Sequence, residues 1–290
     1  MRLRAMAKIN LALDVLGRRP DGYHDVRMIM QTISMYDALD IQIKKEPGIE
    51  LRTNLPYVPE DSRNLAYKAA DLLMQEFHIK EGLQIHLEKF IPVSAGMAGG
   101  SSDAAAVLVG VNNLFRLGLS KQELMKRGST LGADIPYCVM RGTALAEGIG
   151  EKLTPLPSVP ECSVLVGKPP VSVSTKAAYE SLRLDVIDQR PDIDGMIESL
   201  KTGDLRGITS RMQNVFQPGI SGAHPVIGDI IKLMEDNGAM KAIMSGSGPS
   251  VFGIYEKRKD ASNAAEKLRS SGMARTVYVA RMFRVDKPLI

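Results

Sequence analysis

Cysteine and aromatic residues are scarce in this chain of 290 residues. Neither of its two cysteines, Cys138 and Cys162, stands at the spacing of a metal-binding motif. Phe, Trp and Tyr together make up 5% of the residues, and no basic stripe with interleaved aromatics is present. We therefore expect two reduced thiols, and a chain that does not bind nucleic acid.

Long hydrophobic runs are absent as well. No segment approaches the roughly 20 apolar residues that a membrane-spanning helix needs, and Lys8, Asn10 and Asp14 interrupt the N-terminal segment. The charges nearly balance, with 37 Lys and Arg against 33 Asp and Glu and a formal charge of +4. These features favour a cytoplasmic enzyme with no membrane partner, built as one large domain or two ordinary ones.

The most informative stretch is the glycine-rich segment 92–102, PVSAGMAGGSS. It follows a predicted strand at 83–91 and precedes a segment, 104–115, whose apolar residues recur at helical spacing. The backbone N–H groups of such a loop, together with a helix N-terminus, suit a phosphate group. The alternative is an ordinary connection with Ser101 or Ser102 as the helix N-cap. The segment is neither a Walker A loop nor a dinucleotide-binding Gly-x-Gly-x-x-Gly motif.

The rest of the chain alternates predicted strands and helices, which favours an α+β fold. The expected strands cover 1–16, 23–34, 40–44, 48–52, 162–166, 241–244, 251–255 and 276–283. The expected helices begin at 64 and 175 or cover 121–131, 193–200, 205–212, 226–237 and 260–271. Three prolines in 151–160 predict an inter-domain connection, with domains at 1–157 and 158–290. Asp14 fits a solvated strand edge.

Three separated stretches are similar, in their order along the chain, to the three motifs of the GHMP kinases. They are AKINL at 7–11 with PDGYH at 20–24, the loop and helix start at 92–106, and SGSGPS at 245–250. The first stretch and GADIP at 132–136 further resemble the branch of the family that phosphorylates cytidine-diphosphate methylerythritol in the non-mevalonate isoprenoid pathway.

The resemblance implies a two-domain GHMP kinase fold. Its N-terminal domain would be ribosomal-protein-S5-domain-2-like and its C-terminal domain a ferredoxin-like α/β sandwich, with the site in the cleft between them. It also implies ATP as co-substrate, Mg²⁺, transfer of a phosphoryl group to the 2-hydroxyl of the small-molecule substrate, and a monomer or weak homodimer. The alternatives are a homoserine or mevalonate type of GHMP kinase, and a non-catalytic nucleotide-binding protein of the same fold. The sequence does not identify the metal ligands.

Site residues follow from the resemblance, position by position. Lys8 and Asp134 would be the catalytic pair, in which Asp134 accepts the hydroxyl proton and Lys8 keeps that carboxylate ionised. Judged by its neighbours alone, Asp134 before Pro136 fits a helix N-cap. The predicted ATP contacts are Pro92, Val93, Ser94, Ala95, Gly96, Met97, Ala98, Gly99, Gly100, Ser101 and Ser102, with Asn64 and Lys89 at the adenine. The predicted substrate contacts are Asn10, Tyr23, His24, Thr175 and Tyr179, and the third glycine-rich motif contributes Gly246, Ser247 and Gly248.

The loop also departs from the family pattern at several positions. Ser94, Ala95 and Ala98 stand where glycine is frequent in the family, and Asp103 stands where asparagine is frequent. Because alanine favours negative φ, we expect Ala98 to adopt a negative φ angle.

Overall fold

The structure is a computed structural model of the chain and describes residues 1–285. These residues divide into two compact units, neither of which is a continuous stretch of sequence. Unit 1 consists of residues 1–7, 35–93 and 98–140, and unit 2 of residues 8–34, 94–97 and 141–285. Two long strands, β1 (Arg2–Arg18) and β2 (His24–Lys44), contribute residues to both units. The predicted boundary between 157 and 158 stays a prediction.

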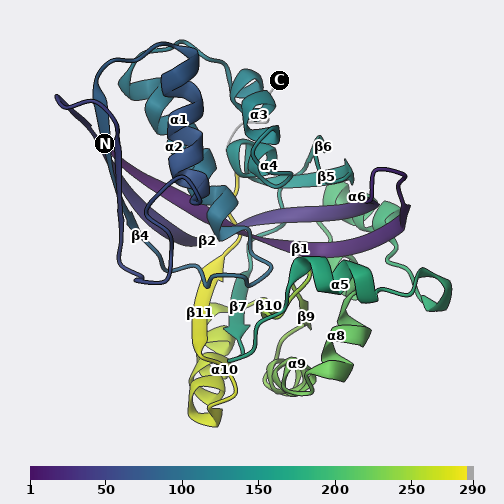
Figure 1. Cartoon of the computed structure of the whole chain (residues 1–290). Helices are drawn as coiled ribbons and strands as arrows, with labels where there is room; N and C mark the ends of the chain where they lie inside the picture. Colours follow the sequence, from purple (N-terminus) through teal and green to yellow (C-terminus); the bar gives the residue numbers. More distant parts are fainter. Residues whose placement is uncertain (286–290) are drawn as a thin grey trace. The chain divides into compact units, whose positions relative to one another are not determined.

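In unit 1, three strands pair side by side. The second half of β2 pairs antiparallel with β4 (Gly82–Glu88), and β4 pairs parallel with β3 (Ile49–Thr53). Two helices of this unit, α1 (Leu65–Glu76) and α2 (Gly99–Leu114), pack against each other (Figure 1). They are followed by α3 (Lys121–Ser129) and α4 (Ile135–Met140).

The local sequence explains where the helices of unit 1 begin. Asn64 is the N-cap of α1, and its side-chain oxygen accepts a hydrogen bond from Ala66 N at 2.9 Å. Ser120 and Glu123 form a capping box at the start of α3. Both starts agree with the sequence prediction. The alanines of α1 are buried, as their helical spacing predicts.

In unit 2, the first half of β2 pairs antiparallel with β5 (Thr143–Gly148), which pairs with β6 (Lys152–Leu156). The sequence prediction was wrong here, because it placed an irregular connection over 151–160. Pro155 lies within β6, opposite Ala144. The ladder of β6 pairs with β5 alone, and an edge strand tolerates a proline that donates no hydrogen bond.

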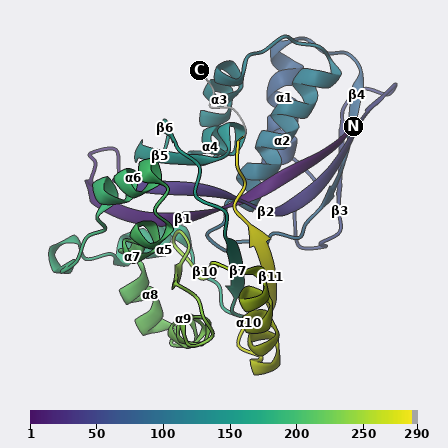
Figure 2. The ribbon, with the colours of Figure 1, turned by 180° about the vertical axis from the view of Figure 1, so that it is seen from behind.

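A second sheet of unit 2 is fully antiparallel, with the strand order β11-β7-β10-β9. Its strands are β7 (Ser163–Lys168), β9 (Lys241–Met244), β10 (Val251–Tyr255) and β11 (Thr276–Arg281). Two helices, α9 (Val226–Asp236) and α10 (Arg258–Ser271), pack on this sheet (Figure 2). A Cβ atom at Gly167 of β7 would lie 2.8 Å from Leu268 and 3.2 Å from Met234, so both helices cover the same face. This is the α/β sandwich that the family resemblance implies for the C-terminal part of the chain.

The remaining elements of unit 2 are short. They are α5 (Thr175–Ser181), the 3-10 helix η1 (Leu184–Val186), α6 (Ile193–Thr202), α7 (Leu205–Ser210), β8 (Gln213–Asn214) and α8 (Gln217–Ala223). β8 pairs parallel with β1. Within residues 1–285, no helix combines the length and the apolar character needed to cross a membrane.

Strand β2 also differs from its prediction. The two strands expected at 23–34 and 40–44 are one strand of 21 residues. The alternation of buried positions continues through Met35, Asp37 and Leu39, which joins the two halves. A buried aspartate in the middle of this pattern resembles a turn residue in sequence, which explains the apparent break.

Candidate functional site

The tip of the glycine-rich loop, residues 94–97, belongs to unit 2, where it bonds to two other motifs. The carbonyl of Met97 accepts a hydrogen bond from the backbone N–H of Lys8 at 3.2 Å. The carbonyl of Gly96 accepts one from Ser245 Oγ at 3.0 Å. The three stretches that the sequence analysis singled out therefore meet at the loop tip.

Gly96 and Gly246 allow the second and third motifs to approach closely. Gly96 has φ +71°, and a Cβ atom there would lie 2.1 Å from the carbonyl oxygen of Ser245. Gly246 has φ +57°, and its Cβ atom would lie 2.8 Å from the carbonyl oxygen of Gly96. Neither position has room for a side chain, because backbone occupies the space on both sides.

Helix α2 begins without a side-chain cap. Its N-cap is Ala98, in the left-handed conformation with φ +55°, so the expectation of a negative φ was wrong and the alternative of a serine cap is excluded. Ser94 likewise has φ +52°. The hydroxyl of Ser102 donates to the carbonyl of Met6 at 2.6 Å instead of capping the helix. A helix start without a side-chain cap leaves N–H groups and the positive end of the helix dipole for an anion.

Lys8 and Asn10 lie next to each other on one face of β1. Lys8 is 5% exposed and Asn10 is fully buried. Lys8 Nζ donates to Asn10 Oδ1 at 2.7 Å, and Asn10 Nδ2 donates to Met28 Sδ at 3.1 Å. Because the amide of Asn10 is neutral, this partner does not offset the positive charge of a lysine ammonium.

Asp134 lies in unit 1 and directly precedes α4. Its carbonyl accepts a hydrogen bond from Cys138 N at 3.0 Å, which is the backbone geometry of a helix start. Its carboxylate makes no side-chain hydrogen bond or ion pair with any residue in the 1–285 range and is half-buried. The carboxylate is therefore free to accept a proton from a bound molecule. The pairing of Lys8 with Asp134 stays a prediction.

The predicted aromatic contacts lie together in unit 2. The rings of His24 and Tyr179 have centroids 5.0 Å apart at an interplanar angle of 35°. Phe216 meets Tyr179 edge to face, with centroids 4.8 Å apart, and was missed by the sequence analysis. Because His24 and Tyr179 are in contact, a base cannot lie between them unless they separate. Tyr23 is 61% exposed and offers a free ring face.

The third motif is held by two further polar contacts in unit 2. Thr175 Oγ1 and Ser247 Oγ are hydrogen bonded at 3.0 Å. The buried Asn214 donates to the carbonyls of Met244 and Gly246, both at 2.8 Å. Asn214 also accepts from Phe216 N at 3.0 Å, so one amide fixes both the motif and the residue that packs on Tyr179. The sequence around Asn214 carries no motif that reveals this role.

Asp14 has a partner that sequence reasoning also missed. Its side chain is 8% exposed and pairs with Arg190 Nη1 at 2.7 Å. The interpretation of Asp14 as a solvated edge residue was therefore wrong. Arg190 also donates to the carbonyl of Val15, so it joins the loop before α6 to β1.

The two predicted adenine contacts, Asn64 and Lys89, are both engaged in unit 1. The amide of Asn64 caps α1 and donates to the carbonyl of Pro59 at 2.7 Å. The ammonium of Lys89 is buried between the carboxylates of Asp37 and Asp103. These bonds favour a structural role for both side chains over a direct contact with the adenine ring.

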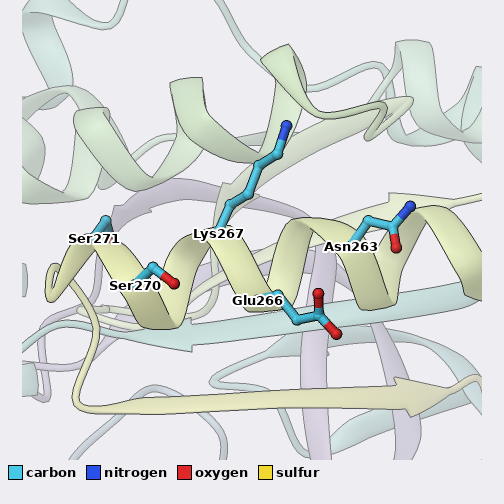
Figure 3. A pocket seen from close by; sticks show the side chains of 5 residues that line it. All are labelled: Asn263, Glu266, Lys267, Ser270 and Ser271. Atoms are coloured by element: carbon cyan, nitrogen blue, oxygen red, sulfur yellow. The ribbon is translucent and has the colours of Figure 1, made fainter.

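Figure 3 shows a surface hollow formed by α10 alone. Its lining residues are Asn263, Glu266, Lys267, Ser270 and Ser271. None of them belongs to the predicted site. Lys267 is engaged with Asn237 Oδ1 at 2.5 Å. Cys138 and Cys162 are both buried, and neither forms a disulfide in the part of the chain that the structure describes.

Comparison with known proteins identifies the class first. The sequence model of the GHMP kinases N terminal domain matches residues 64–142, and that of the GHMP kinases C terminal domain matches residues 196–273. A solved homoserine kinase from Cytophaga hutchinsonii shares the fold, with a TM-score of 0.72 at 18% identity over 95% of this chain and 93% of that one.

More similar proteins narrow the class. A 4-diphosphocytidyl-2-C-methyl-D-erythritol kinase from Lachnospira eligens is 51% identical over 98% of both chains, and one from Caldicellulosiruptor bescii is 49% identical over 93% of this chain and 94% of that one. A crystal structure of 4-(cytidine 5'-diphospho)-2C-methyl-D-erythritol kinase matches with a TM-score of 0.84 at 32% identity, covering 97% of this chain and 99% of that one. The chain belongs to the GHMP kinases and, among them, to the family of the 4-diphosphocytidyl-2-C-methyl-D-erythritol kinases.

Proposed function

We propose that this chain transfers the γ-phosphoryl group of ATP to the 2-hydroxyl of 4-diphosphocytidyl-2-C-methyl-D-erythritol, giving the 2-phosphate and ADP. The observation that carries the proposal is the meeting of the three motifs at the loop tip, through Met97 with Lys8 and through Gly96 with Ser245. The choice of acceptor rests on relatives about half identical over nearly their full length.

The phosphate loop, residues 92–102, would hold the triphosphate. The uncapped start of α2 directs N–H groups and a partial positive charge toward bound phosphate oxygens. Positive φ angles at Ser94, Gly96 and Ala98 shape the backbone around an anion. The loop binds and orients the nucleotide and neutralises part of its charge.

The acceptor hydroxyl would react between Lys8 and Asp134. Its oxygen attacks the γ-phosphorus as the bond to the β–γ bridging oxygen breaks, ADP leaves, and the hydroxyl proton passes to the Asp134 carboxylate. An ordinary carboxylate is a weak base for an alcohol, but a loose transition state requires proton removal only late. Positioning and the positive charge of Lys8 then supply most of the acceleration.

Magnesium would arrive with the nucleotide. No group of three or more His, Cys, Asp or Glu residues within 1–285 could hold a metal ion. A Mg²⁺ ion carried largely by phosphate oxygens and water fits this chain, because Mg²⁺ keeps several waters and needs few protein ligands. It would neutralise phosphate charge during transfer.

The cytosine end would be bound by the aromatic residues of unit 2. Tyr23 offers an exposed ring for stacking, and His24 offers ring nitrogens for the edge of the base. Phe216 and His24 fix Tyr179 from two sides. Asn10 would contact the same substrate while it holds Lys8. We further propose that the enzyme is cytoplasmic.

The test is an assay of ADP release with 4-diphosphocytidyl-2-C-methyl-D-erythritol, homoserine and mevalonate offered in turn. We expect turnover with the first acceptor only. Asp134→Ala should lower kcat by about 10²–10⁴-fold, the contribution of a general base, and leave the KM for ATP within about threefold. Asp236→Ala, which removes an exposed carboxylate of α9, should match the wild type.

Three results would contradict this proposal. Turnover with homoserine or mevalonate would assign a different acceptor. Saturable ATP binding without turnover of any acceptor would indicate a non-catalytic nucleotide-binding protein. A kcat of Asp134→Ala within twofold of the wild type would refute the role of Asp134 as base.

A further inference from the structure

Unit 1 contains a buried cluster of one base and two acids that the proposed reaction does not use. Lys89 Nζ donates to Asp37 Oδ2 and, at 2.6 Å, to Asp103 Oδ2. The three side chains are 4%, 0% and 3% exposed. Burying an amine and two carboxyl groups is costly, and buried ion pairs add little net stability compared with apolar residues. The cluster therefore calls for an explanation other than stability.

The cluster fixes the entry of the phosphate loop. Asp37 Oδ1 accepts hydrogen bonds from the backbone N–H groups of Phe90 at 2.6 Å and Ile91 at 2.7 Å. Asn54 holds the backbone of Lys89 from the other side, accepting from Lys89 N at 2.8 Å and donating to its carbonyl at 3.3 Å. The three residues that lead into the loop are thus bonded to β2 and to the segment after β3.

The same lysine also reaches the exit of the loop. Asp103 lies in the second turn of α2, and its bond to Lys89 ties that helix to the loop entry. The ammonium lies under the first residue of α2, because a Cβ atom at Gly99 would come within 3.2 Å of Lys89 Nζ and 3.1 Å of Ile91 Cγ2.

We propose that Asp37, Lys89 and Asp103 form a clamp that joins the two flanks of the phosphate loop and aims the start of α2 at the nucleotide. Lys89 is a positioning residue in this scheme, since it acts through the loop backbone and does not touch ATP. The inference rests on the proposed function, because it assumes that the loop binds ATP.

Charge within the clamp supports a positioning role. Burial lowers the pKa of Lys89, but the carboxylates of Asp103 and Asp37 outweigh it and raise this pKa, so the ammonium stays charged. Asp103 Oδ1 is buried without a hydrogen-bond partner among the residues described. The bond from Lys89 to Asp103 uses the other oxygen, Oδ2, so Oδ1 takes no part in joining the flanks of the loop.

The experiment measures ATP binding directly by titration calorimetry, alongside the KM for each substrate. The main variant is the double substitution Lys89→Met/Asp103→Leu, which removes the link across the loop but keeps the bonds of Asp37 to Phe90 and Ile91. Asp37 would keep the hydrogen bonds from Phe90 N and Ile91 N, so the variant should fold, but its buried carboxylate loses the ammonium partner and the melting temperature should fall. We expect ATP affinity to fall at least tenfold, with the acceptor KM within twofold.

Single substitutions separate the hydrogen bond from the charge. Asp103→Ala should weaken ATP binding similarly, whereas Asp103→Asn keeps an acceptor for Lys89 and should bind ATP within about threefold of the wild type. The matched control is Glu76→Gln, which weakens the exposed ion pair of Glu76 with Arg127 in the same unit. It should leave ATP binding unchanged.

The outcomes distinguish the clamp from the proposed function. Wild-type ATP affinity in a folded double variant would overturn the clamp and leave the proposed function intact. An equal rise of both KM values together with a lower melting temperature would reduce the cluster to a structural element and overturn the clamp as well. No ATP binding by the wild type would overturn the proposed function, and the clamp with it.

Discussion

Folding changes the pKa of the Asp103 carboxyl group strongly. Burial raises the pKa of its carboxyl to about 8; the Lys89 ammonium opposes this rise and the Asp37 carboxylate adds to it. The ordinary value is 3.8, so the folded chain keeps a proton that the unfolded chain releases as the pH rises above that value. Through this group, the free energy of unfolding falls between about pH 4 and pH 8.

Asp103→Asn should remove this pH dependence. An asparagine releases no proton, so the free energy of unfolding of the variant should fall less steeply between pH 5 and pH 8. The difference between the slopes should reach up to about 1.4 kcal/mol per pH unit, the value for one proton. Urea unfolding at several pH values measures both slopes.

A control variant tests whether the effect belongs to burial. Arg63 lowers the pKa of the exposed Asp61 to about 2, so this carboxylate stays ionised throughout the tested range in either state. Asp61→Asn should therefore keep the wild-type slope. Parallel slopes for Asp103→Asn and the wild type would show that Asp103 is ionised in the folded chain.

At the scale of elements, two matched glycine substitutions test the contact between the loop tip and the third motif. Gly96 and Gly118 have nearly the same φ, +71° and +73°, but only Gly96 faces backbone, since nothing lies within 4 Å of a Cβ atom at Gly118. Gly118→Ala should cost about 1–2 kcal/mol from backbone strain alone. Gly96→Ala should cost a further 1–3 kcal/mol from overlap with Ser245.

The measurement is the free energy of unfolding from urea titrations of both variants. Equal losses for Gly96→Ala and Gly118→Ala would mean that the loop tip moves away from the third motif at no cost. The activity of the Gly118→Ala variant should equal that of the wild type, since Gly118 lies outside the predicted site.

Local sequence patterns predicted most helices and strands of this fold, but they did not predict which strands pair with one another. The helix after Asn64 was predicted from its cap, because caps act within a few residues, and the structure shows that Ser120 caps the helix predicted at 121. β5 was missed and β6 was taken for a connection, because Pro155 reads as a breaker unless the strand is known to lie at an edge. The continuity of β2 depends on burial of Asp37, which its neighbours in sequence do not reveal.

The sequence predicted those parts of the candidate site that lie in recognisable motifs. The loop at 92–102 and the motif at 245–250 have distinctive small residues, and the structure brings them together through Gly96 and Ser245. Lys89 pairs with Asp37, 52 residues away, and nothing local marks that pairing. Asn214 and Phe216 act through packing on other site residues, so no motif identified them.

At the scale of the whole molecule, the two thiols report on global unfolding. Cys138 and Cys162 are 7% and 3% exposed. Burial, with a smaller contribution from the charge of Glu161, raises the pKa of the Cys162 thiol to about 12, which suppresses the reactive thiolate. The native protein should react with a thiol reagent far more slowly than the unfolded chain.

In denaturant, both thiols should react without prior reduction. A titration with a chromogenic thiol reagent across a urea series should show reactivity rising at the same urea concentration as the loss of circular dichroism. Reaction of both thiols in native buffer within the mixing time would instead indicate frequent local opening.

The back-to-back glycines also restrict how this chain can evolve. A residue added at Gly96 meets the carbonyl of Ser245, and one added at Gly246 meets the carbonyl of Gly96. Main-chain atoms are present whatever side chain a position carries, so no compensating mutation at a neighbouring position can make room. A search for second-site suppressors of either substitution should therefore find none at residues next to these glycines. Each glycine should resist replacement whatever the rest of the sequence is.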